Sequence, residues 1–187
     1  MFKMKILSVL FLLAALTGCV SSNYYVLSTA PQPATTYRYV NGTIGVEKVI
    51  VPKYLFKREI AVAKSASQVT FLSGASWAED IDEGLTQRLI SFLQKKFNKP
   101  EVYNYPWDVG EQPRIKVKVQ ISRFIAQGDR VYLDASIQLE NMRTGKRKAK
   151  LFSTTVPSGS SASSIVAAMD RAFDRLEEEV AEGIRRF

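Results

Sequence analysis

The sequence predicts a single α/β domain in which a mixed sheet is packed by two long amphipathic helices. Two stretches, 73–100 and 163–186, repeat apolar residues every three or four positions, as a helix with one buried face does. Three stretches within 115–156 alternate apolar and polar residues, which is typical of antiparallel strands with one open face. A strand on each side of the first helix indicates a parallel crossover. We expect this domain to span residues 24–187.

The N-terminal segment has the pattern of an export signal. Lys3 and Lys5 precede an apolar run over 6–16, which is shorter than the about 20 residues of a spanning helix but typical of a signal peptide. The run ends in Leu16-Thr17-Gly18-Cys19, which looks like a bacterial lipobox. We therefore expect residues 1–18 to be a lipoprotein signal peptide, Cys19 to carry covalent lipid, and 19–23 to form the lipidated cysteine and a short tether. Two alternatives stay open: a buried cysteine in a core strand and an uncleaved signal anchor.

The residues after the cysteine bear on the destination of the chain. Val20 and two serines follow Cys19, without the aspartate that retains lipoproteins in the inner membrane of enteric bacteria. By that resemblance we expect an outer-membrane location facing the periplasm. Several acyl chains provide the combined attachment that stable anchoring needs.

Four short strands are expected before the first helix, at residues 23–27, 43–52, 58–63 and 68–72. The second ends in the apolar run Val49 to Val51, which indicates burial on both faces, and Pro52 ends it. Two prolines within 29–42 predict a loop there.

The first helix is expected to start near Ser73 and to end at Pro100. Ser76 and Glu79 match a capping box. Four acidic residues near this end, including Asp80, Asp82 and Glu83, suit the positive end of the helix dipole. Without a histidine or cysteine among them, we predict no metal site. The expected buried stripe comprises Trp77, Ile81, Leu85, Leu89, Phe92, Leu93 and Phe97.

A strand at 101–107, a three-stranded meander and a final helix complete the predicted domain. "QGD" and "NMRTGK" supply the turns of the meander. The final helix runs from Ser163 or Ser164 to about Arg186. We expect Arg175 to pair with Glu179, and Glu182 with Arg186, on its outer face. The expected buried stripe comprises Ile165, Met169, Ala172, Phe173, Leu176, Val180 and Ile184.

The composition argues against an enzyme. The chain has no histidine, which removes histidine-based triads and imidazole switches. Its one thiol is assigned to acylation, and no glycine-rich phosphate-binding motif is present. We expect no catalytic residues, no metal and no cofactor beyond the covalent lipid on Cys19.

The charge balance indicates anionic partners. Without Lys3 and Lys5, 24 basic and 18 acidic side chains leave a formal charge of +6. Export argues against nucleic acid and favours lipid headgroups or acidic protein surfaces. A solvated, positively biased surface explains the charge equally well.

Three stretches in order behind the lipobox carry a family resemblance: "NYYVL" (23–27), "VEKVIVPKYL" (46–55) and "WAEDIDEGLTQRLISFL" (77–93). Together with the final "EEEVAEGIRRF", they resemble the PqiC family of ABC-type transport auxiliary lipoproteins. Asp80 stands where the family often has proline, and either residue suits the first turn of a helix. The matching motif positions are Tyr24, Tyr25, Leu27, Pro52, Tyr54, Leu55 and Trp77.

The resemblance implies a non-enzymatic α/β domain at the outer membrane that works with an MCE-domain protein and inner-membrane components to move lipid and support envelope integrity. It also implies a homo-oligomer. The alternatives are a structural lipoprotein for outer-membrane protein or lipopolysaccharide assembly, a lipid-binding carrier and, last, a periplasmic hydrolase. Core packing or turn geometry explains most of the motif positions. We predict a partner or headgroup contact on the loop that holds Lys53, Tyr54, Lys57 and Arg58, because tyrosine is enriched at interfaces.

Overall fold

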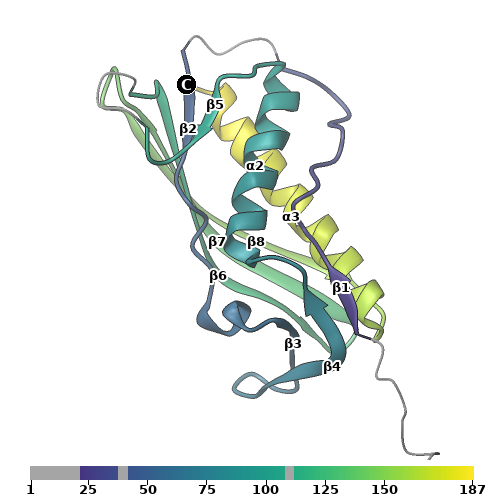
Figure 1. The fold of residues 1–187 in the computed structure, drawn as a ribbon. Coiled ribbons are helices and arrows are strands. Elements are labelled where there is room, and N and C mark those ends of the chain that lie inside the picture. The colour runs from purple at the N-terminus through teal and green to yellow at the C-terminus, as the bar shows by residue number, and fades with distance from the viewer. Residues whose placement is uncertain (1–21, 38–41, 108–111) are drawn as a thin grey trace, which may run out of the picture.

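The computed structural model describes residues 22–37, 42–107 and 112–187. An eight-stranded sheet forms one layer, and helices α2 (Ile81–Phe97) and α3 (Ala162–Arg185) lie over one of its faces (Figure 1). This arrangement confirms the predicted fold class. The predicted signal peptide and Cys19 lie outside the described residues.

The sheet is mixed, as predicted. Its strands are β1 (Asn23–Tyr25), β2 (Ile44–Val46), β3 (Glu59–Ala63), β4 (Val69–Trp77), β5 (Val102–Asn104), β6 (Ile115–Gln127), β7 (Arg130–Asn141) and β8 (Arg147–Pro157), and the 3-10 helix η1 (Lys53–Phe56) follows β2. The strand order is β1-β4-β3-β6-β2-β5, and β7 and β8 continue from the other edge of β6. The parallel pair β2–β5 is joined by a connection that contains α2, together with β3 and β4.

The long strand β6 organises the sheet. One edge pairs with β7 along almost its whole length, and the other holds β2 at one end and β3 at the opposite end. Alternate side chains of β6 and β7 are buried under the helices. The predicted stripe of α3 and that of α2 from Ile81 onward are buried against them. The core is therefore the single layer between sheet and helices.

The predicted start of the first helix is wrong. Residues 73–77 extend β4, where Ser76 pairs with Tyr24 of β1 on one side and Glu59 of β3 on the other. The helix begins only at Ile81, after Asp80. Because the backbone of Ser76 belongs to the sheet, the local capping pattern is overridden by strand pairing, and Trp77 is buried from a strand.

The predicted strand at 43–52 is shorter than expected, and its predicted burial on both faces is wrong. β2 ends at Val46, and the chain returns to β6 through a single bridge between Ile50 and Gln120. Val49 and Val51 are buried, whereas Ile50 is 45% exposed. The segment thus alternates its side chains like a half-covered strand.

Candidate functional site

The segment that follows β1 crosses the two helices. We call residues 26–37 the strap; it runs from β1 over the helix layer (Figure 1). Its residues Leu27 and Ala30 are buried. The carbonyl of Ala30 accepts a hydrogen bond from Lys95 Nζ at 2.7 Å, and the Tyr37 amide donates to the Lys96 carbonyl at 2.7 Å. The strap is therefore tied to α2 at both of these points.

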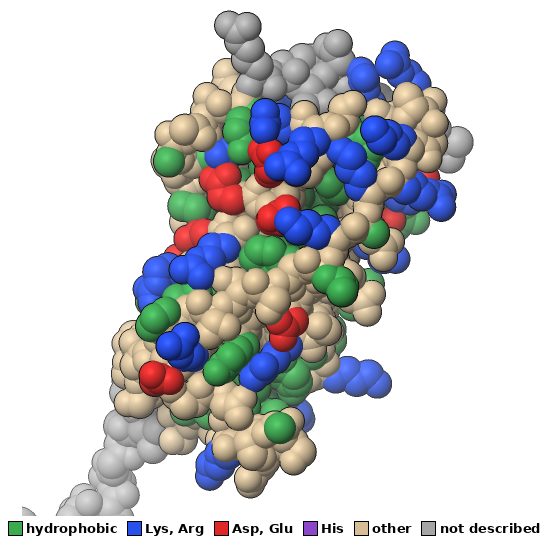
Figure 2. Space-filling model, turned by 180° about the vertical axis from the view of Figure 1, so that it is seen from behind, with side chains coloured by type: hydrophobic (Ala, Val, Ile, Leu, Met, Phe, Trp, Pro, Cys, Tyr) green, Lys and Arg blue, Asp and Glu red, His purple; other side chains and the backbone are tan. Residues whose placement is uncertain are grey.

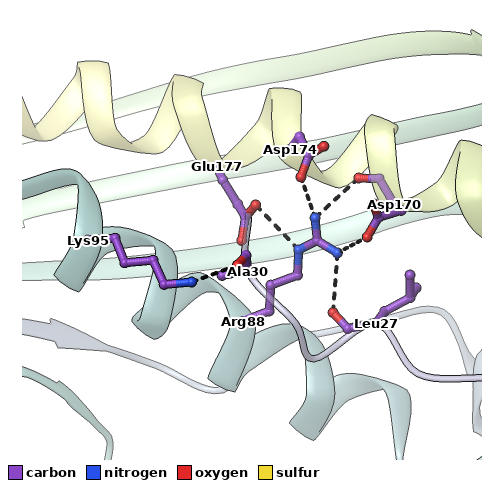
Figure 3. A network of polar contacts seen from close by, with 7 residues as sticks. All are labelled: Leu27, Ala30, Arg88, Lys95, Asp170, Asp174 and Glu177. Carbon is purple, nitrogen blue, oxygen red and sulfur yellow. Dashed lines mark hydrogen bonds and ion pairs between the residues drawn. The ribbon is translucent and has the colours of Figure 1, made fainter. Parts of the chain in front are cut away.

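A buried arginine connects the strap to both helices (Figure 3). Arg88 of α2 is fully buried, and its guanidinium donates to carboxylates of three residues on α3: Asp170, Asp174 and Glu177. The Arg88 Nη1 atom also lies 3.4 Å from the carbonyl oxygen of Leu27. One cation thus holds α2, α3 and the strap together, which we call the Arg88 cluster.

The protonation of this cluster follows from its burial. Burial raises the pKa of Glu177 to about 8, although Arg88 opposes the shift. Burial also raises the pKa of Asp174. Desolvation disfavours the charged form of Arg88, but Glu177 and Asp170 outweigh it and raise its pKa. Within the described part of the chain, Glu177 Oε1 has no hydrogen-bond partner. Near neutral pH the cluster therefore contains a charged arginine and a Glu177 that is largely protonated.

Stability is expected to fall with rising pH because of Glu177. The pKa of Glu177 in the folded protein, about 8, lies above its unfolded value of 4.5. The contribution of Glu177 to the free energy of unfolding is therefore fully present below pH 4.5 and is lost as the pH rises through 8. No histidine titrates in this range. Between pH 5.5 and 7.5, urea denaturation should show the free energy of unfolding falling by about 1 kcal/mol per pH unit. In Glu177→Gln most of this slope should be lost; parallel slopes in the two proteins would contradict the assignment.

A second polar group fastens the end of the strap. Lys96 is buried, and its Nζ contacts Glu178 of α3 at 2.8 Å and Thr35 Oγ1 at 3.3 Å. The same ammonium lies 4.5 Å from the ring centre of Tyr37, whose hydroxyl donates to Glu182 at 3.2 Å. The strap is therefore held at several points along its length.

The family motif positions mostly serve packing. Leu27, Leu55 and Trp77 are buried, and Tyr25 packs against the core. Tyr24 is 63% exposed on the short strand β1. Pro52 precedes η1 as its N-cap residue.

The predicted contact loop divides into a buried and an exposed part. The hydroxyl of Tyr54 accepts a hydrogen bond from the Phe124 amide at 2.9 Å, so this tyrosine fixes η1 against β6. Lys53, Lys57 and Arg58 are exposed, and Phe56 between them is 59% exposed. The aromatic that faces solvent on this loop is thus Phe56.

The loop lies near the start of the folded domain. The Arg58 carbonyl accepts a hydrogen bond from the Trp77 amide at 2.6 Å, and Trp77 pairs with Tyr25 of β1. Since neighbouring strands are about 4.8 Å apart, Arg58 lies about 10 Å from β1. Only three residues separate Cys19 from β1, a span of about 14 Å at most.

Sequence reasoning missed the Arg88 cluster. The available signal was the spacing of Asp170, Asp174 and Glu177, which recur four and three residues apart and so share one face of α3. The predicted pair Arg175–Glu179 is also wrong: Arg175 donates to Thr154 Oγ1 at 2.9 Å, and Glu179 binds Lys150 at 2.6 Å. The predicted pair Glu182–Arg186 is confirmed at 2.8 Å.

Residues 22–37, 42–107 and 112–187 contain neither a candidate membrane span nor a candidate metal site. None of their helices is long and apolar enough to cross a membrane. The same residues contain no group of three or more side chains suited to hold a metal ion.

The fold and the Arg88 cluster define a small α/β domain whose N-terminal strand and strap are fastened to its helix layer. The chain belongs to the family of ABC-type transport auxiliary lipoprotein components, whose model matches residues 25–181. The family resemblance of the sequence is thereby confirmed.

Solved structures show the same fold. A crystal structure of an uncharacterised protein is 18% identical, with a TM-score of 0.70 over 88% of this chain and 99% of that one. Protein XCC0632 from Xanthomonas campestris, of the DUF330 family, is 15% identical, with a TM-score of 0.69 over 87% of this chain and 95% of that one. Among curated protein sequences, none matches this chain significantly.

Proposed function

We propose that this protein is a non-enzymatic lipoprotein, anchored through Cys19 to the periplasmic face of the outer membrane, that assists an MCE-type and ABC-type lipid transport system and thereby supports envelope integrity. The observation that carries the proposal is the family match over 25–181, directly behind a lipobox. An auxiliary component acts through partners, and the MCE-domain protein and inner-membrane transport components are the partners that the motif resemblance implies.

The arrangement of the N-terminus supports an anchoring role. A lipid on Cys19 would hold β1, and β1 continues into the strap, which is bonded to both helices. A force applied through the lipid would therefore be transmitted to both helices through the hydrogen bonds of the strap. The strap suits a domain that must keep a fixed position near a membrane while partners bind it.

Copurification tests the transport assignment. The tagged lipoprotein should be isolated from detergent-solubilised envelopes and its companions identified by mass spectrometry. We expect an ABC-type ATPase or permease and an MCE-domain protein, and density-gradient separation should place the lipoprotein with the outer membrane. Isolation with lipopolysaccharide-assembly or barrel-assembly proteins alone would favour the structural alternative.

The filled core argues against a lipid-binding carrier. Large side chains such as Phe92, Phe124 and Phe173 are fully buried between sheet and helices. Mass spectrometry of lipid extracted from a soluble Cys19→Ala form tests this point. We expect no stoichiometric phospholipid, and a copurifying phospholipid would favour the carrier.

The exposed cations beside Phe56 provide a contact close to the anchor. Reversing their charge in Lys53→Glu, Lys57→Glu and Arg58→Glu should weaken binding to acidic partners or headgroups, because opposite charges become like charges. In crosslinking pull-downs from envelopes, we expect the yield of captured partner to fall severalfold. Lys64→Glu, on the turn that joins β3 and β4, is the control and should leave the yield unchanged. Unchanged capture in the triple variant would refute this contact.

A further inference from the structure

The last strand of the sheet has a free edge. Within the described ranges, β8 pairs with β7 alone, in continuous register from Arg147 to Pro157 and without a bulge. Unpaired edge strands present rows of N–H and C=O groups to which another strand can add. Proteins commonly blunt such edges, and the two halves of β8 differ in this respect.

In the half of β8 that lies near the start of α3, side chains of α3 block the outer edge of the strand. Arg171 donates to the carbonyl of Pro157 at 3.1 Å, and Arg175 donates to the carbonyl of Thr155 at 3.2 Å. Both arginines reach from α3 to the outer edge of the strand. Strand addition in this half would have to displace them.

The outward row of peptide groups continues into the other half. The amide of Ser158 donates to the carbonyl of Asp129, so these two residues form a hydrogen-bonded pair. Along an antiparallel strand, hydrogen-bonded residues alternate with residues whose peptide groups point away from that partner strand. The odd-numbered residues of β8 therefore direct their N–H and C=O groups away from β7. These residues are Ser153, Leu151, Ala149 and Arg147. We call residues 147–153 the open edge. Leu151 at its centre is 84% exposed, which is a high value for a leucine inside a regular strand.

The surroundings of the open edge are basic. Arg147 is paired with Glu140 and Lys150 with Glu179. Lys148 Nζ donates to the carbonyl of Arg186 at 2.7 Å, and none of the ion pairs among the described residues involves Lys146 or Lys148. Burial lowers the pKa of Lys148, and the positive charges of Lys146 and Arg186 lower it further. This cluster of cations favours a negatively charged occupant.

The open edge also points away from the anchored end. In Figure 1 the described chain begins at the lower end, whereas the C-terminus lies at the upper end. At about 3.3 Å per residue, Arg147 lies about 30 Å from Pro157 along β8. Figure 2 shows the sheet from behind, with Lys and Arg side chains concentrated toward the upper end. This position favours a protein partner over the membrane that holds the lipid.

We propose that the open edge binds an extended acidic segment of a partner protein by strand addition. Main-chain hydrogen bonds to Ala149, Leu151 and Ser153 would provide the pairing. The partner residue opposite Leu151 would be apolar and would cover this side chain. The partner residues opposite Lys148 and Lys150 would lie on the helix side of the sheet and would be acidic. A second copy of this chain would bring its own cations to the same edge, so charge disfavours self-pairing. The proposal goes beyond the proposed function and holds for any transport system that this protein serves.

Peptide binding to the detergent-solubilised full-length lipoprotein tests the proposal. The probe is a fluorescein-labelled peptide of alternating glutamate and valine, compared with a version that has lysine for glutamate. We expect anisotropy to show binding of the acidic peptide alone. Hydrogen exchange should slow at the amides of Ala149, Leu151 and Ser153, and added salt should weaken binding.

Two proline variants locate the site. Leu151→Pro removes an outward N–H without touching the ladder to β7 and should weaken binding about tenfold. Thr155→Pro makes the same change in the half that Arg175 already blocks and should leave binding unchanged. Leu151→Glu, which retains the backbone, should also weaken binding by repulsion.

Four outcomes would overturn the proposal. The first is failure of the acidic peptide to bind, and the second is an equal loss of binding in both proline variants. The third is a dimer, seen by light scattering, that dissociates in Leu151→Pro, which would assign the edge to a second copy of this chain. The fourth is binding to phosphatidylglycerol vesicles that Leu151→Pro abolishes, which would assign the edge to the membrane.

Discussion

Replacing Arg88 by methionine is expected to destabilise the domain by roughly 3 kcal/mol or more, because it removes the buried cation that binds the carboxyl groups of Asp170, Asp174 and Glu177. The strap would also lose the bond to the carbonyl of Leu27. Urea denaturation of a soluble form at pH 7 measures this effect. Hydrogen exchange should additionally show faster opening of the strap than of the sheet.

The control for this variant is an exposed ion pair of similar chemistry. Arg185 binds Glu182 at 2.7 Å on the surface of α3. Arg185→Met should cost at most about 1 kcal/mol, since exposed pairs contribute little. If Arg88→Met proved no more destabilising than Arg185→Met, the Arg88 cluster would not be what holds strap and helices together.

Replacing Cys19 by alanine is expected to move nearly all of the protein from the membrane fraction to the soluble fraction of the envelope. The physical reason is that the proposed acyl chains would supply the attachment, and among the described residues no helix is long and apolar enough to replace them. Fractionation and incorporation of labelled palmitate measure the two consequences. The folded domain should be unaffected, so the soluble variant should unfold at the same urea concentration as a delipidated wild type. Label that persisted in Cys19→Ala would contradict lipidation at this residue.

The elements that the sequence predicted well have strong periodicity over many residues. The alternation of Val117, Val119 and Ile121 defined β6, and the stripe from Ile165 to Ile184 defined α3. Such patterns need no knowledge of the partner layer, because burial of one face is enough to set them. The mixed character of the sheet was also predicted, from the strand expected on each side of the first helix and from the alternating meander, but the strand order was not.

The errors arose where tertiary pairing overrides a local signal. Ser76 and Glu79 form a plausible capping box, yet strands on both sides of Ser76 keep the chain extended through Trp77. The residues that pair with Ser76 lie about 20 to 50 positions away in the sequence, and local propensities do not include such distant contacts. The exposed Ile50 has the same origin, because a single bridge to Gln120 sets its orientation.

The Arg88 cluster could be predicted only in part. The spacing of Asp170, Asp174 and Glu177 marks an acidic face on α3, but it does not identify the cation that meets it. Arg88 follows Gln87 and precedes Leu89 on α2, and only the packing of the two helices shows that it is buried. Buried charges of this kind depend on geometry that no single helix contains.

Strand β1, which follows the proposed anchor in the sequence, and the open edge lie toward opposite ends of the domain. The lipid would hold β1 and the strap at one end, while the basic open edge of β8 faces away from it. This polarity suits a protein that positions a partner relative to the membrane. The Arg88 cluster connects the two ends, because it joins the strap to α3, which packs on β7 and β8.

Crosslinking in intact envelopes, followed by identification of the captured proteins, tests whether this lipoprotein assists an ABC-type lipid transporter, because both membranes and their spacing are preserved. We expect the wild-type lipoprotein to capture an MCE-domain protein and subunits of an ABC-type transporter. We expect Cys19→Ala to capture much less of them. Capture of barrel-assembly or lipopolysaccharide-assembly proteins alone, with no transporter component, would contradict the transport assignment.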